Sequence, residues 1–268
     1  MASRLLRALW PLTWPVRAYW LRSEWKLGKK LLLDRMLKPL LPAPPRGFEA
    51  ELPGGARVFL HYREDIGLVT LLGGGFERAE LDVARRLALP ETTAIDVGAN
   101  VGVYSVVLAR AVGPEGRVLA FEPGPENVRR LEENLARNGL ANVDVHAVAL
   151  AEEPGELVLR LGSDPAYHST GDVFEGRASG GELRVRARTL DEVWREAGSP
   201  EVSVVKIDTE GGELAVLRGA RELLRAKRPA LLVEARDPRV ETWLGERGYE
   251  GTRPPGFALG NVLFVPKA

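Results

Sequence analysis

The stretch "AIDVGANVGVYS", residues 94–105, places two glycines, an asparagine and an aspartate between an apolar run and a segment of helical character. Glycine has no Cβ, so it permits a sharp turn and a close approach between the backbone and a ligand. The helix that follows leaves unpaired N–H groups at its N-terminus, which favour an anionic group. The stretch therefore predicts a ligand-binding turn between a strand and a helix.

Short apolar runs alternate with helical patterns after this turn. A helix is predicted over 103–112, and Pro125 begins the next helix because its fixed φ suits the first helical turn. Strands that alternate with helices of this length imply right-handed crossovers, so we expect a doubly wound α/β fold with a mostly parallel sheet. The predicted strands are 93–97, 117–122, 142–150, 202–208, 229–235 and 261–267.

The sequence before the turn is organised differently. Residues 39–47, "PLLPAPPRG", contain four prolines and are typical of a stiff linker. The apolar runs 56–62 and 67–72 are predicted to pair as a hairpin that leads into the main domain. We therefore expect an N-terminal arm with its linker over residues 1–46 and a single large domain over residues 47–268.

The composition is that of an ordinary globular protein, with 45% hydrophobic and 28% charged residues among 268. The chain has no cysteine, which excludes disulfides, thiolate metal sites and a cysteine nucleophile. Its three histidines, His61, His146 and His168, show no ligand spacing, so no zinc centre is expected. Glutamine is absent, which favours a thermophile as the source, although a biased genomic composition would give the same pattern.

Residues 1–40 are basic and rich in tryptophan. Nine Lys or Arg against two acids give this segment a charge of +7, and four of the six tryptophans fall in it. Two interpretations stay open: peripheral contact with the inner face of a membrane, or a cap that packs on the main domain or on a second copy in a homodimer. The longest uncharged stretch has nine residues, whereas a crossing helix needs about 20. We expect a cytoplasmic protein.

The spacing of residues within the turn limits which class of ligand it can bind. A nicotinamide-binding turn would have the order G-x-G-x-x-G, but Ala99 and Asn100 follow Gly98, and the next glycine is Gly102. Asp96 supplies a charge complementary to an ammonium group. Glu122 ends the next predicted strand, where an acid can accept both hydroxyls of a ribose. A nucleoside with an amino-acid tail fits these features, which points to S-adenosyl-L-methionine as cofactor.

Four motifs, "IDVGANVGVYS", "VLAFEPGPENVRRLEENLARNG", "AVAL" and "VVKIDTEGGELAVLRGA", follow one another in an order and spacing that resemble the FkbM family of S-adenosylmethionine-dependent methyltransferases. The resemblance runs from about residue 76 to residue 234. It implies a class I methyltransferase (Rossmann-like) fold, with a seven-stranded sheet whose last strand is antiparallel. It also implies methyl transfer, usually to a hydroxyl of a sugar or natural product.

The resemblance assigns cofactor-binding residues one by one. Glu122 matches the ribose acid of the family, and the strand and turn that include Ala149 match the region near the adenine. Residues 1–46 lie outside the resemblance. The cofactor residues that it implies are Asp96, Gly98, Ala99, Asn100, Gly102, Phe121, Glu122, Pro123 and Ala149.

The motif "KIDTEGGE", residues 206–213, places three acids at the carboxyl end of a predicted strand. Methyl transfer to a hydroxyl needs alignment of the acceptor and removal of one proton. We expect Asp208 to contact the methyl donor or the acceptor, Glu210 to act as base or acceptor ligand, and Glu213 to bind substrate. Two alternatives stay open: the acids cap the next helix, or Asp208 and Glu210 hold a divalent cation. No third ligand is identifiable, so no metal is predicted.

Further candidates lie elsewhere in the chain. The polar stretch 162–181, between predicted strands at 156–161 and 183–188, has the length of a substrate loop. It contains Tyr167 as a substrate-binding candidate and His168 as a candidate base or a solvated side chain. Glu77, which forms with Phe76 an aromatic–acid pair similar to that of the family, is predicted to close the cofactor site and bind substrate, or only to begin a helix. Glu234, at the end of an apolar strand, is predicted to contact the acceptor.

The sequence favours an S-adenosylmethionine-dependent O-methyltransferase that acts on a small-molecule or glycan acceptor, with transfer to nitrogen left open. The alternative is a non-catalytic nucleotide-binding or membrane-docking protein that keeps the methyltransferase fold. A nicotinamide oxidoreductase is disfavoured by the order of the glycines. No nucleic-acid partner is expected.

Overall fold

The structure is a computed structural model that describes residues 38–43, 45–73, 75–162 and 178–267. It divides into two compact units. One unit comprises Met1–Ala50 and Phe59–Phe76, and the other comprises Glu51–Val58 and Glu77–Ala268. Within the described ranges, no helix has the length and apolar character needed to cross a membrane.

The first unit contains a short 3-10 helix η3 (Lys38–Leu40), helix α4 (Asp65–Gly73) and the larger parts of two paired strands, β1 (Gly47–Glu51) and β2 (Arg57–His61). The predicted pairing of 56–62 with 67–72 is wrong, because 67–72 lies in α4 and β1 is the partner of β2. A six-residue apolar run has no periodicity that separates a strand from a buried helix. Close packing also fixes Gly67, whose added Cβ would lie 2.0 Å from the His61 carbonyl oxygen.

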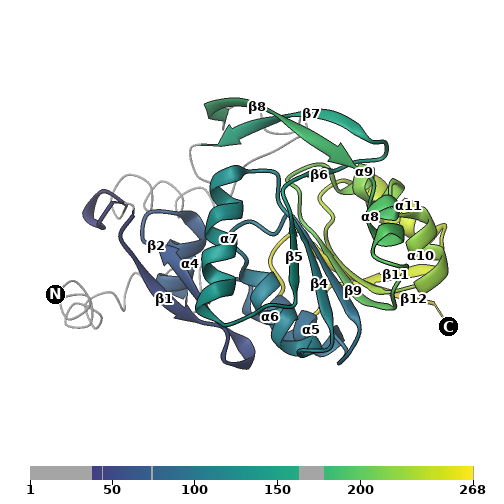
Figure 1. Cartoon of the computed structure of the whole chain (residues 1–268), viewed down its shortest axis with the longest axis horizontal. Helices are drawn as coiled ribbons and strands as arrows, with labels where there is room; N and C mark the ends of the chain where they lie inside the picture. The colour runs from purple at the N-terminus through teal and green to yellow at the C-terminus, as the bar shows by residue number, and fades with distance from the viewer. Residues whose placement is uncertain (1–37, 44, 74, 163–177, 268) are drawn as a thin grey trace. The chain divides into compact units, whose positions relative to one another are not determined.

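The second unit is built on a seven-stranded sheet (Figure 1). Five neighbouring strands are parallel, and β12, the last in the chain, runs antiparallel to both of its neighbours. The predicted doubly wound sheet with an antiparallel last strand is therefore confirmed. The order across the sheet is β11 (Tyr249–Thr252), β12 (Asn261–Pro266), β10 (Ala230–Glu234), β9 (Val202–Ile207), β3 (Thr93–Val97), β4 (Arg117–Phe121) and β5 (Val143–His146).

Helices cover both faces of this sheet. In Figure 1, α5, α6 and α7 lie on one side and α8 to α11 on the other. Every residue of β3 is buried, as expected for a strand between two helical layers. A 3-10 turn, η4 (Pro53–Gly55), precedes β2. The helices are α5 (Arg78–Leu87), α6 (Val103–Val112), α7 (Pro125–Arg137), α8 (Leu190–Glu196), α9 (Glu213–Arg218), α10 (Arg221–Lys227) and α11 (Pro238–Gly245).

A smaller three-stranded sheet is inserted between β5 and α8. It contains β6 (Ala149–Leu150), β7 (Gly155–Gly162) and β8 (Ala178–Arg188), in the order β6-β8-β7. The strands predicted at 156–161 and 183–188 are confirmed as parts of β7 and β8. Leu159 and Val185 are buried on one face of this sheet together with Ala149.

Strand register brings polar residues to one face at the carboxyl edge of the large sheet. Asp96 on β3 pairs with Lys206 on β9, and Glu234 on β10 pairs with Asn261 on β12. Leu232 also pairs with Lys206, and side chains two residues apart on a strand share a face. Asp96, Lys206, Glu234 and Asn261 therefore lie on a common face, and continued alternation adds Asp208.

Candidate active site

The turn after β3 is shaped by contacts with the protein itself. Gly98, Asn100 and Gly102 have φ values of 77°, 50° and 90°, in the left-handed region that favours glycine. A Cβ on Gly98 would lie 1.7 Å from the Asp208 carbonyl oxygen, and one on Gly102 would lie 2.5 Å from Leu131 Cδ1. The sequence attributed these glycines to close approach of a ligand. Packing within the protein already requires Gly98 and Gly102, so a ligand is not the only reason for them.

Glu122 joins the turn after β3 to the turn after β4. Its Oε2 accepts the Asn100 N–H at 2.9 Å, and its Oε1 accepts the Gly124 N–H at 2.9 Å and Asn127 Nδ2 at 3.2 Å. Burial raises the pKa of Glu122, although these hydrogen bonds lower it in part. Glu122 thus holds the loop rigid, and Oε2 keeps capacity for one further donor.

Two neighbours complete this part of the site. The Gly98 and Ala99 N–H groups both donate to the Phe121 carbonyl oxygen, which fixes the turn on β4. The Phe121 ring stacks on His146 with centroids 4.9 Å apart and an interplanar angle of 14°. His146 was not among the predicted site residues, and its Nε2 has no hydrogen-bond partner within the described part of the chain. Its position at the end of β5 is the signal that could have identified it.

Asp96 is completely buried at the end of β3. Ser105 Oγ donates to its Oδ2 at 2.6 Å, whereas Oδ1 has no hydrogen-bond partner among the described residues. Burial raises the pKa of Asp96, and the nearby Lys206 ammonium lowers it in part. An unsatisfied buried carboxylate oxygen carries a free-energy cost that a donor from a ligand would remove.

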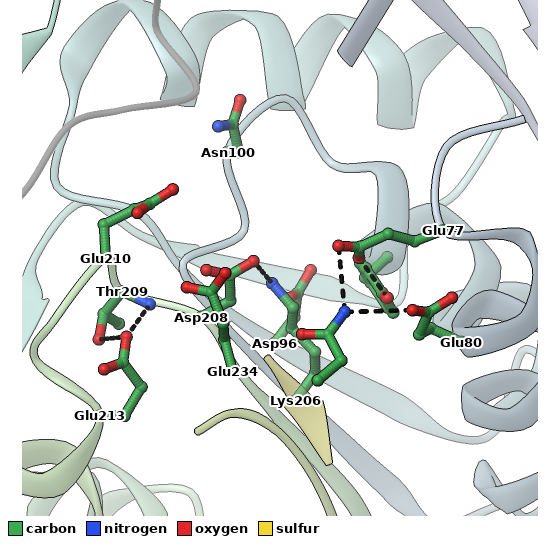
Figure 2. Close-up of polar contacts among 12 residues, drawn as sticks. Glu77, Glu80, Asp96, Asn100, Lys206, Asp208, Thr209, Glu210, Glu213 and Glu234 are labelled. Atoms are coloured by element: carbon green, nitrogen blue, oxygen red, sulfur yellow. Dashed lines mark hydrogen bonds and ion pairs between the residues drawn. The ribbon is translucent and has the colours of Figure 1, made fainter. Parts of the chain in front are cut away.

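Lys206 is a buried cation at the centre of the site (Figure 2). Its Nζ lies 3.1 Å from Asp208 Oδ2 and 4.8 Å from the centroid of the Tyr104 ring. Burial alone would lower its pKa, but the Asp208, Asp96 and Glu77 carboxylates raise it above the ordinary value. Lys206 therefore stays charged and holds Asp208 in one position.

Three carboxylates, which we name the carboxyl cluster, converge beside Lys206: Asp208, Glu210 and Glu234. One oxygen of each lies within 4.8 Å of the others. Arg236 Nη2 lies 2.5 Å from Glu234 Oε1, and its Nη1 lies 3.6 Å from Glu210 Oε2. Glu234 is the third oxygen ligand that the divalent-cation alternative lacked, but in this structure Arg236 and Lys206 supply the positive charge.

Burial raises the pKa of Glu234 to about 9, and the Asp208 and Glu210 carboxylates add to the shift. Three carboxylates at this separation do not all ionise readily, because like charges disfavour one another. The structure brings Asp208, Glu210 and Glu234 together at the carboxyl edge of the sheet, and the roles assigned to them from the sequence stay predictions. Arg236, two residues beyond Glu234, was not predicted.

Glu77 belongs to a polar network that links α5, α6 and β12. Tyr104 Oη donates to its Oε2 at 2.7 Å, and Asn261 Nδ2 donates to its Oε1 at 3.1 Å and to Glu80 Oε1 at 3.3 Å. Burial, followed by repulsion from Asp208, raises the pKa of Glu77 to about 7. Glu77 immediately precedes α5, as the helix-start interpretation expected, and its contact with an acceptor stays a prediction.

Glu213 has a local role in the structure. Its Oε1 accepts the Thr209 N–H at 2.9 Å and the Thr209 Oγ1 hydroxyl at 3.1 Å (Figure 2). The same oxygen accepts the Gly211 N–H at 3.0 Å. It therefore stabilises the turn before α9, which is the capping alternative that the sequence left open. Ala149 is buried within the small sheet, and its contact with adenine stays a prediction. Tyr167 and His168 lie outside the described residues.

The parallel sheet, the turn after β3 and the acids at the strand ends define a class I methyltransferase. The model of the methyltransferase FkbM domain family matches residues 96–250. The chain therefore belongs to the FkbM methyltransferase family, as its motifs predicted.

Three known proteins are similar to parts of this chain. Methyltransferase sdnD of Sordaria araneosa is 29% identical to this chain over a matched region that includes 59% of this chain and 74% of sdnD. Hexuronic acid methyltransferase AglP of Haloferax volcanii is 30% identical and covers 56% of this chain and 59% of its own length. The chain spans less than two thirds of the length of several relatives that it matches. A solved methyltransferase FkbM from Methylobacillus flagellatus KT is 19% identical over 74% of this chain and 52% of its own, with a TM-score of 0.46.

Proposed function

We propose that this methyltransferase uses S-adenosyl-L-methionine to methylate a hydroxyl of a sugar, glycolipid or other hydroxylated acceptor. The observation that carries the proposal is the carboxyl cluster beside the turn after β3. The Asp208 N–H donates to the Val97 carbonyl oxygen at 3.0 Å, so the acids adjoin that turn directly. Carboxylates accept hydrogen bonds from hydroxyls and remove protons, which are the two actions that methyl transfer to oxygen requires.

The residues of the turn fit this cofactor. The unpartnered Asp96 Oδ1 is complementary to an ammonium group, and Glu122 Oε2 has capacity for a ribose hydroxyl. S-adenosyl-L-methionine supplies the methyl group on a positively charged sulfonium. The chain's part is to hold that group next to Asp208, to orient the acceptor and to take its proton.

The sugar acceptor is supported by the relative AglP, which is a hexuronic acid methyltransferase. It is also supported by the mixture of carboxylates and one guanidinium at the cluster. Sugar hydroxyls donate to carboxylates and accept from a guanidinium. Glu210, Glu234 and Arg236 offer both kinds of group at the ends of β9 and β10.

Calorimetry with S-adenosyl-L-methionine and its demethylated product tests cofactor binding. We expect both to bind the folded protein, and Asp96→Asn to weaken both. If neither ligand binds to the folded protein, the non-catalytic alternative is favoured. Mass spectrometry of glycans and lipids from cells with and without the gene then tests transfer, through a mass difference of about 14 Da per methyl group that Asp208→Ala abolishes.

Residues 1–40 form a separate part of the proposal. Their charge of +7 and four tryptophans support peripheral contact with an anionic membrane, and packing on a second copy is the alternative. Sedimentation with anionic vesicles, with and without these residues, separates the two. If the full chain and the chain without residues 1–40 sediment equally with the vesicles, these residues do not bind the membrane.

A further inference from the structure

The loop between β11 and β12 lies at the same edge of the large sheet as the carboxyl cluster. β12 runs antiparallel to β10, and Asn261 at its start pairs with Glu234 at the end of β10. The segment that leads into Asn261 therefore borders the site. From residue 254 to residue 260 its sequence is "PPGFALG", which contains no charged side chain. We name residues 254–260 the apolar rim.

The apolar rim is in direct contact with the carboxyl cluster through Gly260. A Cβ on Gly260 would lie 3.3 Å from Arg236 Cγ and 3.5 Å from Glu234 Cγ. The Gly260 carbonyl oxygen also accepts the Ala235 N–H at 2.8 Å, which fixes the rim on the turn after β10. Leu259 directly precedes Gly260, and consecutive Cα atoms are about 3.8 Å apart. The Leu259 Cα therefore lies within about 9 Å of Glu234 Cγ.

Contacts with α5 fix the other end of the apolar rim. The Ala258 N–H donates to Oε1 of Glu80, a completely buried glutamate of α5. A Cβ on Gly256 would lie 3.2 Å from the Ala79 Cβ, so the backbone of the rim packs closely on the same helix. The prolines at 254–255 restrict the backbone further, because their rings fix φ. The rim is thus a loop whose side chains are positioned by a rigid scaffold, which is where binding residues commonly occur.

Leu259 is 78% exposed on this fixed segment. A single exposed leucine is common on protein surfaces and indicates no function by itself. Here the neighbouring Pro255 and Ala258 are exposed as well, so the surface of the rim is apolar over several residues. The carboxyl cluster and Arg236, directly beside it, supply carboxylates and a guanidinium. The two surfaces together match a molecule that carries a hydroxyl close to an apolar group.

We infer that Leu259 and the apolar rim bind an apolar group of the methyl acceptor, so that the acceptor is amphipathic: a hydroxylated molecule with an attached alkyl or aromatic group, not a free sugar. This inference rests on the proposed function, because the carboxyl cluster must hold the acceptor hydroxyl. Contact between the leucine and an apolar group removes apolar surface from water, which favours binding. A free sugar with the same hydroxyl lacks this contact and binds more weakly.

Transfer of a radiolabelled methyl group to a cell extract tests the class of acceptor. A methanol extract of cells that lack the gene is separated on a reversed-phase column into retained and unretained fractions. Each fraction is incubated with the full chain and S-adenosyl-L-methionine labelled in its methyl group. We expect more label in the retained fraction, because retention requires an apolar group. Equal or greater label in the unretained fraction would overturn the inference and leave the methyltransferase intact. If neither fraction takes up label, the proposed function and the inference both fail.

Leu259→Ser tests the residue itself. We expect its apparent KM for the retained fraction to rise about three- to tenfold, with kcat and the affinity for S-adenosyl-L-methionine unchanged, since only acceptor binding loses a contact. Leu259→Met keeps an apolar side chain and should behave as the wild type. Leu89→Ser is the matched control, because Leu89 is 53% exposed but precedes β3 at the amino edge of the sheet. Equal KM values for the two serine variants, or a loss of donor affinity in Leu259→Ser, would overturn the assignment of Leu259.

Discussion

Lys206 Nζ lies 3.1 Å from Asp208 Oδ2, and the lysine ammonium is buried beneath the carboxyl edge of the sheet. Asp208 is the better exposed partner, with 25% of its side chain accessible against 7% for Lys206. The lysine thus approaches from the interior and leaves the other side of the carboxylate open to ligands. This arrangement orients Asp208 without covering it.

Replacement of Lys206 by methionine keeps the side-chain volume but removes the charge. We expect Lys206→Met to lower the free energy of unfolding by about 3 kcal/mol, because Asp208 and Asp96 lose the cation that compensates them. Urea denaturation measures the change. Lys227→Met is a suitable control, since Lys227 pairs only with the exposed Glu201 among the described ion pairs and should cost less than about 1 kcal/mol. Equal costs for the two variants would contradict the role of Lys206.

Stability should fall as the pH rises through the neutral range. The pKa values of Glu77 and Glu234 are raised to about 7 and about 9, so the folded protein binds more protons than the unfolded chain above the ordinary value of 4.5. The free energy of unfolding then decreases with pH until each folded pKa is passed. Glu234→Gln should flatten this slope by at most about 1.4 kcal/mol per pH unit between pH 5 and 9. An unchanged slope in urea titrations would contradict the raised pKa of Glu234.

Gly98 should tolerate no side chain. A Cβ there meets the Asp208 carbonyl oxygen at 1.7 Å, and φ is 77°. Gly139 has a similar φ of 64° but no atom within 4 Å of an added Cβ, so it isolates the cost of the backbone conformation. We expect Gly98→Ala to destabilise the protein by at least about 2 kcal/mol more than Gly139→Ala, because the backbone carbonyl must move. Similar melting temperatures for the two variants would contradict this packing argument.

Sequence patterns predicted the central strands of the large sheet because these strands are mostly buried and alternate with helices. β3, for example, is five consecutive buried residues before a glycine turn. The edge strand β11 was not predicted, and the predicted strand 142–150 is divided between β5 of the large sheet and β6 of the small one. The segment 67–72 was predicted wrongly, since burial makes a short helix and a strand equally apolar. Motifs at strand ends also located Asp208 and Glu234, because the ends of parallel strands share one edge.

The partners of these acids could not be predicted in the same way. Arg236 contacts Glu234 and Glu210 through the turn after β10, whose conformation no periodicity determines. Asn261 joins Glu77 only because β12 inserts beside β10, 184 residues along the chain from Glu77. The close approach of the Asp208 carbonyl oxygen to Gly98, which excludes a side chain there, likewise depends on the register between β3 and β9. Such long-range contacts follow from tertiary structure, not from local sequence.

Glu122 provides the last test, because its two oxygens accept only N–H donors. In Glu122→Gln, an amide NH₂ must face the Asn100 N–H or the Gly124 N–H, which replaces a hydrogen bond by contact between two donors. We expect affinity for S-adenosyl-L-methionine and for its demethylated product to fall by the same factor, about tenfold or more, since the turn changes and the sulfur charge is not involved. Calorimetry of both ligands measures this, with the exposed Glu133→Gln on α7 as control. A selective loss for one ligand would place the effect of Glu122 at the sulfur and contradict its assignment to the ribose side of the site.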